Sequence, residues 1–497
     1  MGGRLTVQTY HPAFRVLATK NIQRAAQPAT SGTGVWDITP YLGDGSTISV
    51  QKSLYHPCGS AVITIPDQPY APEPNSGRPA DSLYGLLEPT DGIEIYLARR
   101  PEQYGWSTSA VGNCPVLMRG FIRNIRRTEH MGRDGKPQRF IAIQAQDYGA
   151  VFDILRLWNL KTGVLGWPDA FDFMLKTGAD YTPKPTAEFV QIFVDLANQW
   201  LDATYNRGGW TWRIDPDFTV TQGVHVMQGL NSQEGPLWNL MLREMDSPWN
   251  ELFIEDREEN PTLVYRPTPW RQYTPSGDRL TWKYLEQGGQ TVSAETVDLD
   301  IEDIVSLDPS RTDIDIQNMY WLDCPTAIQG LQIAQIMGAA KNGELEDYIF
   351  DRDHENNDPE VYGERLLIAS FRQWPNETEQ NPNGAAKDAW KRNNDTLFPD
   401  WWKQRIAWLR DANRDNGILE SGRMTVKGDE HLRIGKYLNI QRGQFEWEAY
   451  LTGVTHEFAP FREYVTHLEF SRGTGFWTRL LSTWPPYLRE GKKGVYF

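Results

Sequence analysis

Three acids at alternating positions are the residues of this sequence whose spacing comes nearest to chemistry. From residue 297 to 302, apolar residues alternate with Asp298, Asp300 and Glu302. Successive side chains of a β-strand point to opposite faces, so the pattern predicts three carboxylates on one face of a strand. Such a row could supply paired acids, a cation site, the wall of a pore or a solvated surface. Three neighbouring acids on a polar face favour solvation first, a channel wall second and catalysis last.

Other chemical motifs fail at identifiable positions. The sequence contains no GxSxG, HExxH, GxGxxG or GxxxxGK followed by Ser or Thr. His456 and Glu457 begin a zinc-like motif, but Pro460 stands where the second ligand would be. The acidic run that starts at Asp351 has Asn356 where a calcium loop needs glycine. We therefore expect no enzyme activity, no cofactor and no metal site.

Tryptophan is unusually frequent, with 20 residues. Aromatic faces stack on sugar rings, so Trp platforms beside paired acids would suit a glycan hydrolase or a carbohydrate-binding adhesin. The positions favour packing instead. Trp200 lies on a helical apolar face, and Trp249 and Trp447 lie within strand-like patterns. We expect Trp249, Trp447, Phe253 and Tyr265 to anchor barrel cores or subunit interfaces.

Length and charge limit the class of protein. At about 150 residues per domain, 497 residues suggest roughly three domains. Lys and Arg total 50 against 65 for Asp and Glu, and the net charge of -15 should repel nucleic acid. No apolar run approaches the length of a membrane span, about 18 residues. Cys58, Cys114 and Cys324 are far apart in the sequence, which suits idle thiols in a chain made in a reducing cytoplasm.

Alternating patterns predict antiparallel strands in residues 46–65, 92–100 and 116–149, the last a hairpin that turns at residues 132–135. Strand-like patterns also follow Pro248 and fill residues 418–473. Two β-rich regions share a plan. GIEIYLARR, MRGFIRNI and RFIAIQAQDYG follow one another in the first region, and IGKYLNIQR, LTGVTHEF and YVTHLEFSRG do so in the second. This is either coincidence among hairpins or a duplicated β-barrel.

Helical spacing separates these regions. Residues 186–206 have one apolar face, with Thr186 as the expected N-cap, and a second helix should cover residues 237–245. Residues 323–417 return to helical patterns around a polar loop at 374–396. A helix that begins near Pro399 should end at Gly417.

Several blocks together resemble one protein family. PWNELFIEDREENPTLVYRPTPW, SGRMTVKGDEHLRIGKYLNIQ and YLTGVTHEFAPFREYVTHLEFSRGTGF, in this order, resemble the central baseplate hub protein of contractile phage tails. WDITPYLGDGSTISVQKS, GSAVITIPD and the strand blocks up to residue 155 look like the first tube-type barrel of such hubs. The resemblance covers residues 35–155 and 246–476.

The resemblance implies a non-enzymatic virion protein of the tail baseplate. Family hubs are homotrimers whose subunits each contribute two tube-like barrels, so that three chains form a pseudo-sixfold ring. That ring joins the hexameric tail tube to the trimeric central spike. From their position, the insertions at 156–245 and 323–417 are expected to contact neighbouring baseplate proteins. Tape-measure protein and DNA pass through its channel, DNA without specific binding. Asp298, Asp300 and Glu302 are then candidates for the channel wall.

The expected fold class is α+β, mainly β, with two tube-type antiparallel β-barrel domains and helical insertions. The expected divisions are an N-terminal arm (1–34), a first barrel (35–155), an α-containing insertion (156–245), a discontinuous second barrel (246–322 and 418–476), a helical insertion (323–417) and a C-terminal tail (477–497).

Overall fold

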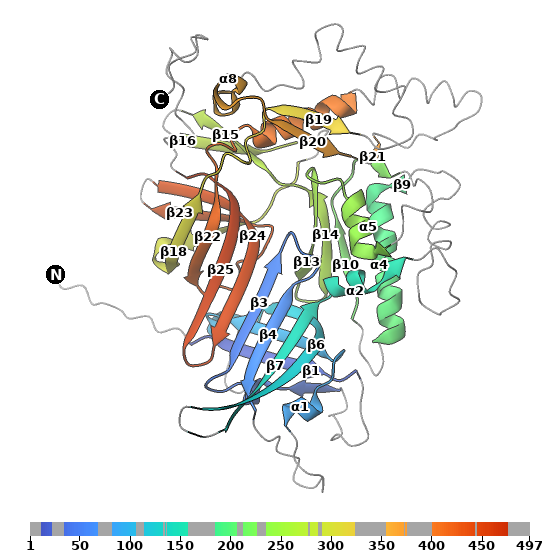
Figure 1. Ribbon diagram of the computed structural model, residues 1–497, viewed down its shortest axis with the longest axis vertical. Coiled ribbons are helices and arrows are strands. Elements are labelled where there is room, and N and C mark those ends of the chain that lie inside the picture. The colour runs from blue at the N-terminus through green and yellow to red at the C-terminus, as the bar shows by residue number, and fades with distance from the viewer. Residues whose placement is uncertain are drawn as a thin grey trace, which may run out of the picture.

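The computed structural model describes residues 11–21, 34–67, 82–105, 114–132, 135, 137–157, 184–205, 212–225, 235–276, 279–286, 291–323, 354–371, 373–374, 400–442 and 445–475. Strands dominate, and most strand pairs are antiparallel, so the predicted mainly-β α+β class is confirmed (Figure 1). The expected C-terminal tail and most of the 374–396 loop lie outside the described residues.

One sheet of 13 strands contains two groups that we call the first and the second β unit. The first β unit consists of β1 (Ala13–Thr19), β3 (Thr47–Ser53), β4 (Ser60–Pro66), β5 (Gly92–Ala98), β6 (Val116–Met131) and β7 (Pro137–Asp147). The second consists of β17 (Thr296–Asp300), β18 (Ile304–Ser310), β22 (Glu420–Lys427), β23 (Tyr437–Arg442), β24 (Phe445–Ala459) and β25 (Glu463–Gly473). The remaining strand, β2 (Val35–Asp37), pairs with β1.

The two β units have the same topology. Their neighbour orders are β3-β4-β7-β6-β5-β1 and β18-β22-β25-β24-β23-β17, and corresponding strands follow one another in the same chain order. The β6–β7 hairpin has a bulge between Ile122 and Asn124, and the β24–β25 hairpin has one between Leu451 and Gly453. One pairing differs, because β1 is antiparallel to β5 whereas β17 is parallel to β23. This repeat favours duplication over coincidence.

Each β unit curls around its own apolar core. Alternate residues of β4 are buried, including Ile63 and Ile65, as the strand period of two requires. Val16 of β1 and Ile48 of β3 join them in one cluster, although these strands lie at opposite ends of the unit. α1 (Leu83–Leu86) adds Leu83 to this core. A second cluster fills the other unit in the same way.

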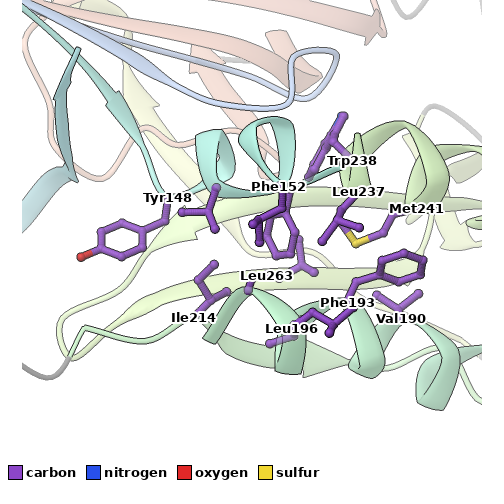
Figure 2. Close-up of a cluster of buried hydrophobic side chains, with 14 of the residues drawn as sticks. Tyr148, Phe152, Val190, Phe193, Leu196, Ile214, Leu237, Trp238, Met241 and Leu263 are labelled. Carbon is purple, nitrogen blue, oxygen red and sulfur yellow. The ribbon is translucent and has the colours of Figure 1, made fainter. Parts of the chain in front are cut away.

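A helical layer packs on a separate three-stranded sheet. α2 (Gly149–Ile154), α4 (Thr186–Thr204) and α5 (Leu237–Glu244) contribute side chains to one core with β10 (Asp215–Phe218), β13 (Asn250–Asp256) and β14 (Pro261–Pro267). Figure 2 shows Phe152, Phe193, Trp238 and Leu263 meeting in this core. The two predicted helices are confirmed. The predicted N-cap is wrong: Pro185 occupies that position, and the Thr186 hydroxyl donates to the Gly223 carbonyl at 3.1 Å.

A third layer lies beyond the second β unit. It contains the hairpin β15 (Arg271–Ser276) and β16 (Arg279–Tyr284), the parallel pair β19 (Met319–Asp323) and β20 (Leu366–Ser370), the short α8 (Pro359–Tyr362), and a helix at residues 400–413. Apolar residues of the pair β19–β20 and of the 400–413 helix form its core. The predicted helix after Pro399 is therefore confirmed, but it gives way to turns before Gly417.

Short elements complete the described chain. They are η1 (Thr39–Tyr41), η2 (Pro101–Tyr104), β8 (Arg156–Leu157), β9 (Lys184–Pro185), β11 (Val224–His225), β12 (Gly235–Pro236), η4 (Ile301–Asp303), η5 (Glu355–Asn357) and β21 (Gln373–Trp374).

Three expected boundaries differ from the structure. Residues 13–19 form β1 and pair along their length with β5, so they belong to the first β unit and not to an arm. β13 and β14 pair with β10 and not with the second β unit, so that unit begins at β17. The stretch 323–417 is only partly helical, because β20 and β21 lie within it. These pairings join segments far apart in sequence, which local patterns do not encode.

Candidate functional site

The acids at 298, 300 and 302 face solvent, but not as one strand face. β17 ends at Asp300, and Glu302 lies in η4. All three acids are exposed, while Leu299 is buried in the core of the second β unit. Asp298 accepts a hydrogen bond from the Asn439 side chain at 2.7 Å. The row therefore presents negative charge to solvent and contains no enclosed pair of carboxylates suited to acid–base catalysis.

The next acid, Asp303, is used differently. Its carboxylate accepts two hydrogen bonds from the Arg99 guanidinium, at 2.8 and 2.9 Å, and one from Lys427 at 3.0 Å. These bonds hold the pKa of Asp303 below its ordinary value. Because Arg99 follows β5 and Lys427 ends β22, Asp303 ties the two β units together.

Trp249 anchors the third layer. Its ring is fully buried, and its indole N–H donates to the Arg405 carbonyl at 3.2 Å. The Arg405 guanidinium lies 4.6 Å from the centre of the Trp249 ring and pairs with Asp246. Burial lowers the pKa of Arg405, and Asp246 opposes that effect. One aromatic ring thus joins the start of β13 to the helix at 400–413.

The other three predicted anchors are buried in two further clusters. Tyr265 lies in the helical-layer core, and its hydroxyl donates to the Met245 carbonyl at 3.1 Å. Phe253 and Trp447 lie in the core of the second β unit, where the Trp447 ring packs edge-on to Phe470 at 5.0 Å. The four residues occupy three separate cores, so the structure does not bring them together as one site.

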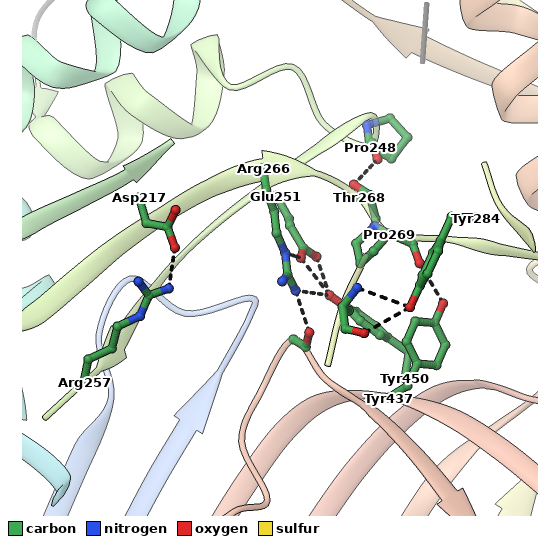
Figure 3. Close-up of polar contacts among 12 residues, drawn as sticks. Asp217, Pro248, Glu251, Arg257, Arg266, Thr268, Pro269, Tyr284, Tyr437 and Tyr450 are labelled. Atoms are coloured by element: carbon green, nitrogen blue, oxygen red, sulfur yellow. Dashed lines mark hydrogen bonds and ion pairs between the residues drawn. The ribbon is translucent and has the colours of Figure 1, made fainter. Parts of the chain in front are cut away.

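A polar contact fastens β13 and β14 to the second β unit (Figure 3). The Glu251 carboxylate accepts a hydrogen bond from Arg266 at 2.6 Å and from the Tyr450 hydroxyl at 2.7 Å. Arg266 also donates to the Gly435 carbonyl at 2.5 Å. Burial raises the pKa of Glu251, and Arg266 opposes that effect. Local sequence patterns do not reveal this contact, because Tyr450 lies 199 residues after Glu251.

The two β units meet at a strand pair, and a half-buried cation lies on one of its strands. The second half of β24 pairs with β3, with Glu457 opposite Ser49. Lys52 on β3 forms ion pairs with Asp147 at 2.8 Å and with Asp256 at 2.5 Å. Burial alone would lower the pKa of Lys52, but the two carboxylates raise it above its ordinary value. Lys52 therefore stays charged and links the first β unit to β13, a role that no spacing in the sequence signals.

A second group of polar residues bridges the two β units. Asp429, Glu430 and His431 place ligand-type atoms within 4.8 Å of one another. Glu430 already accepts from the Arg99 backbone N–H at 2.9 Å and from the Tyr104 hydroxyl at 3.0 Å, and His431 contacts Asp429 at 2.8 Å. These bonds account for the cluster as a tie between units.

Tryptophan exposure bears on the sugar-binding alternative. Among tryptophans whose burial the structure describes, only Trp282 is exposed, at 42%. A hollow of about 360 Å³ is lined partly by Tyr55, Trp270 and Trp408, but Trp408 is buried and Trp270 half-buried. The described part of the chain therefore has no exposed row of Trp rings.

No described helix combines the length and apolar character that crossing a bilayer requires.

Comparisons with known proteins give distant likenesses. No protein-family model and no curated protein matches the chain. Among solved structures, the chain is similar to a tail protein from Neisseria meningitidis MC58, with 9% identity and a TM-score of 0.43, covering 93% of this chain and 97% of that one. It is also similar to a 43 kDa tail protein of prophage MuSo2 from Shewanella oneidensis, with 10% identity and a TM-score of 0.42, covering 92% of this chain and 96% of that one. A third similar structure is a prophage tail protein from Listeria monocytogenes EGD-e, with 9% identity and a TM-score of 0.41, covering 97% of this chain and 100% of that one.

Proposed function

We propose that the chain is a structural subunit of a phage tail baseplate and, within it, the central hub. The observation that carries the proposal is the repeated β unit: two groups of strands with one neighbour order, one chain order and a bulge at the same place. The order of sequence blocks that resembles hub proteins supports the same conclusion. The role is mechanical and needs no reaction.

The repeat has a geometric consequence. Three copies of a chain with two similar units present six similar positions, while the chain as a whole keeps threefold symmetry. A trimer of this kind fits a sixfold tail tube on one side and a threefold central spike on the other. The helical layer and the third layer lie outside the β units, where they are available to neighbouring baseplate proteins (Figure 1).

The charge suits a conduit. In this proposal Asp298, Asp300 and Glu302 line the channel through which tape-measure protein and DNA pass. Exposed carboxylates repel phosphates, so DNA moves past them without sticking. The protein would then act in the virion, at the tail baseplate, after synthesis in the host cytoplasm.

The mass of the assembled protein tests the proposal. Native mass spectrometry of the full chain should give three times 57.0 kDa. Electron microscopy should show a ring with six similar densities around a channel. A stable monomer that forms no ring, even with candidate tube and spike proteins present, would contradict the hub. Hydrolysis of peptidoglycan or polysaccharide by the purified chain would favour the glycan hydrolase instead.

A further inference from the structure

The contact between the β units inside one chain is a strand pair that can recur between chains. The first half of β24 pairs with β23, and its second half continues along the same edge to pair with β3. The sheet is therefore continuous from the second β unit to the first, and β24 and β3 are the strands that join them. By the repeat, β6 corresponds to β24, and β18 corresponds to β3.

The correspondence extends to single residues. Asn124 and Gly453 each follow the bulge of their hairpin. One row across the first β unit runs Asn124, Gln144, Val62, Ser49, and the matching row across the second runs Gly453, Glu469, Arg423, Asp308. Ser49 thus corresponds to Asp308. Glu457 lies four residues after Gly453, and Thr128 lies four residues after Asn124, so Glu457 corresponds to Thr128.

The two strands that correspond to this junction have free edges. Along β6, β5 and the residues just before it cover one edge as far as Ile122, and within the described chain no strand covers that edge from Arg123 onward. Among the described strands, β18 ends the sheet and pairs only with β22. Val305 and Leu307 on β18 are 63% and 38% exposed. Unpaired edges are templates for another strand.

The charges of the two edges are complementary. β6 has exposed Arg123 at its bulge and exposed Arg126 and Arg127 beyond it, of which Arg127 is already paired with Asp67 at 2.8 Å. The exposed Asp308 lies on β18. Opposite charges across paired strands stabilise the pair and discriminate against a second basic edge. Pro309 cannot donate to a ladder, which hinders indiscriminate pairing of β18.

We propose that β18 of one copy pairs antiparallel with the outer part of β6 of a second copy, in the register that β3 and β24 use within the chain. This places Thr128 opposite Asp308 and Arg126 opposite Ser310. The two edges differ, so each copy binds one neighbour through β6 and another through β18, as a closed ring requires. The inference rests on the proposed ring and supplies its contact between subunits.

Cysteine cross-linking of the full chain tests the register. Opposite residues of an antiparallel pair have Cα atoms about 4.5 to 5.5 Å apart, which a disulfide can span. The variant Thr128→Cys/Asp308→Cys should give covalent multimers on mild oxidation, severalfold above either single variant. Ser49→Cys/Glu457→Cys is the matched control, because it bridges the corresponding positions within one chain and should cross-link without forming multimers. The single variants also measure any reaction of the natural Cys58, Cys114 and Cys324.

A second pair guards against a variant that fails to assemble. Arg126→Cys/Ser310→Cys lies in the same register and should also cross-link copies, whereas Arg126→Cys/Asp308→Cys is out of register and should cross-link less. If the reduced variants have the ring mass but neither in-register pair links copies, while the intrachain control reacts, the strand pairing is wrong and the hub stands. If the unaltered chain is monomeric, both the hub and this contact fail.

Discussion

Single residues fix how the third layer attaches, and Trp249 is the clearest case. The ring is fully buried, holds a hydrogen bond to the Arg405 carbonyl, and lies against the Arg405 guanidinium. Arg405 is itself buried and paired with Asp246. A buried arginine needs its neighbours to exclude water and hold its geometry, so loss of the ring affects more than apolar contact.

Trp249→Ala should lower the free energy of unfolding by about 3 to 5 kcal/mol, the range for large-to-small changes in a core. Chemical denaturation followed by circular dichroism measures it. Trp282→Ala is the matched control, because Trp282 is 42% exposed and stacks on Arg271 at 3.6 Å. That change should cost about 1 kcal/mol or less. Equal losses in the two variants would contradict the assignment of Trp249 as a core anchor.

Among helices and strands, the periodicity of apolar residues predicted the elements that contacts between near neighbours in sequence determine. The alternation in residues 116–149 gave the β6–β7 hairpin, and the apolar face of residues 186–206 gave α4. The three acids looked like one strand, but the chain turns after Asp300, and the alternation carries no sign of that turn. β3 pairs with β24 several hundred residues away, so nothing local could reveal it. The ion pairs of Lys52 with Asp147 and Asp256 also join residues that are 95 and 204 positions apart, and the sequence does not reveal them for the same reason.

The junction of the β units also contains a buried histidine. His456 on β24 stands opposite Val50 of β3 and contacts the Tyr464 hydroxyl at 3.2 Å. Burial lowers its pKa from 6.5 to about 4, Arg433 adds to that effect, and Asp429 opposes it. The unfolded chain therefore binds this proton below about pH 6.5, whereas the folded chain does so only near pH 4.

Folded stability should consequently fall as pH drops from about 6.5 to about 4, with a contribution from His456 of about 3 kcal/mol. His456→Gln removes the titrating group, so unfolding free energies measured at several pH values should fall less steeply over this window. Buried carboxylates titrate in both proteins, and the difference between them isolates His456. His467→Gln, a change at a half-exposed histidine of the same hairpin, is the control. A wild-type slope in the His456 variant would show that the junction does not hold a neutral histidine.

For the whole molecule, the position of charge matters more than its total. The net charge is -15, yet exposed arginines gather along the outer part of β6 and acids along β17 and η4. In the proposed ring the basic strand meets a neighbouring copy, while the acids face the channel. Net charge alone would make every face repel DNA equally, whereas a channel wall should repel it most where those acids lie.

Neutralising the three acids distinguishes repulsion of DNA by net charge from repulsion by acids at the channel wall. The variant Asp298→Asn/Asp300→Asn/Glu302→Gln should keep the ring mass and change the unfolding free energy by about 0.5 kcal/mol or less, because the three side chains are exposed. Its rings should bind short duplex DNA more tightly than the unaltered protein at low salt, with the gain lost as salt rises. Fluorescence anisotropy measures that binding.

The charge-matched control Glu188→Gln/Asp195→Asn/Asp202→Asn alters exposed acids of α4. Both variants lose the same charge. An equal gain in DNA binding would therefore show that net charge causes the gain, and it would contradict the channel wall. A gain confined to the Asp298/Asp300/Glu302 variant would show that the position of these acids causes it.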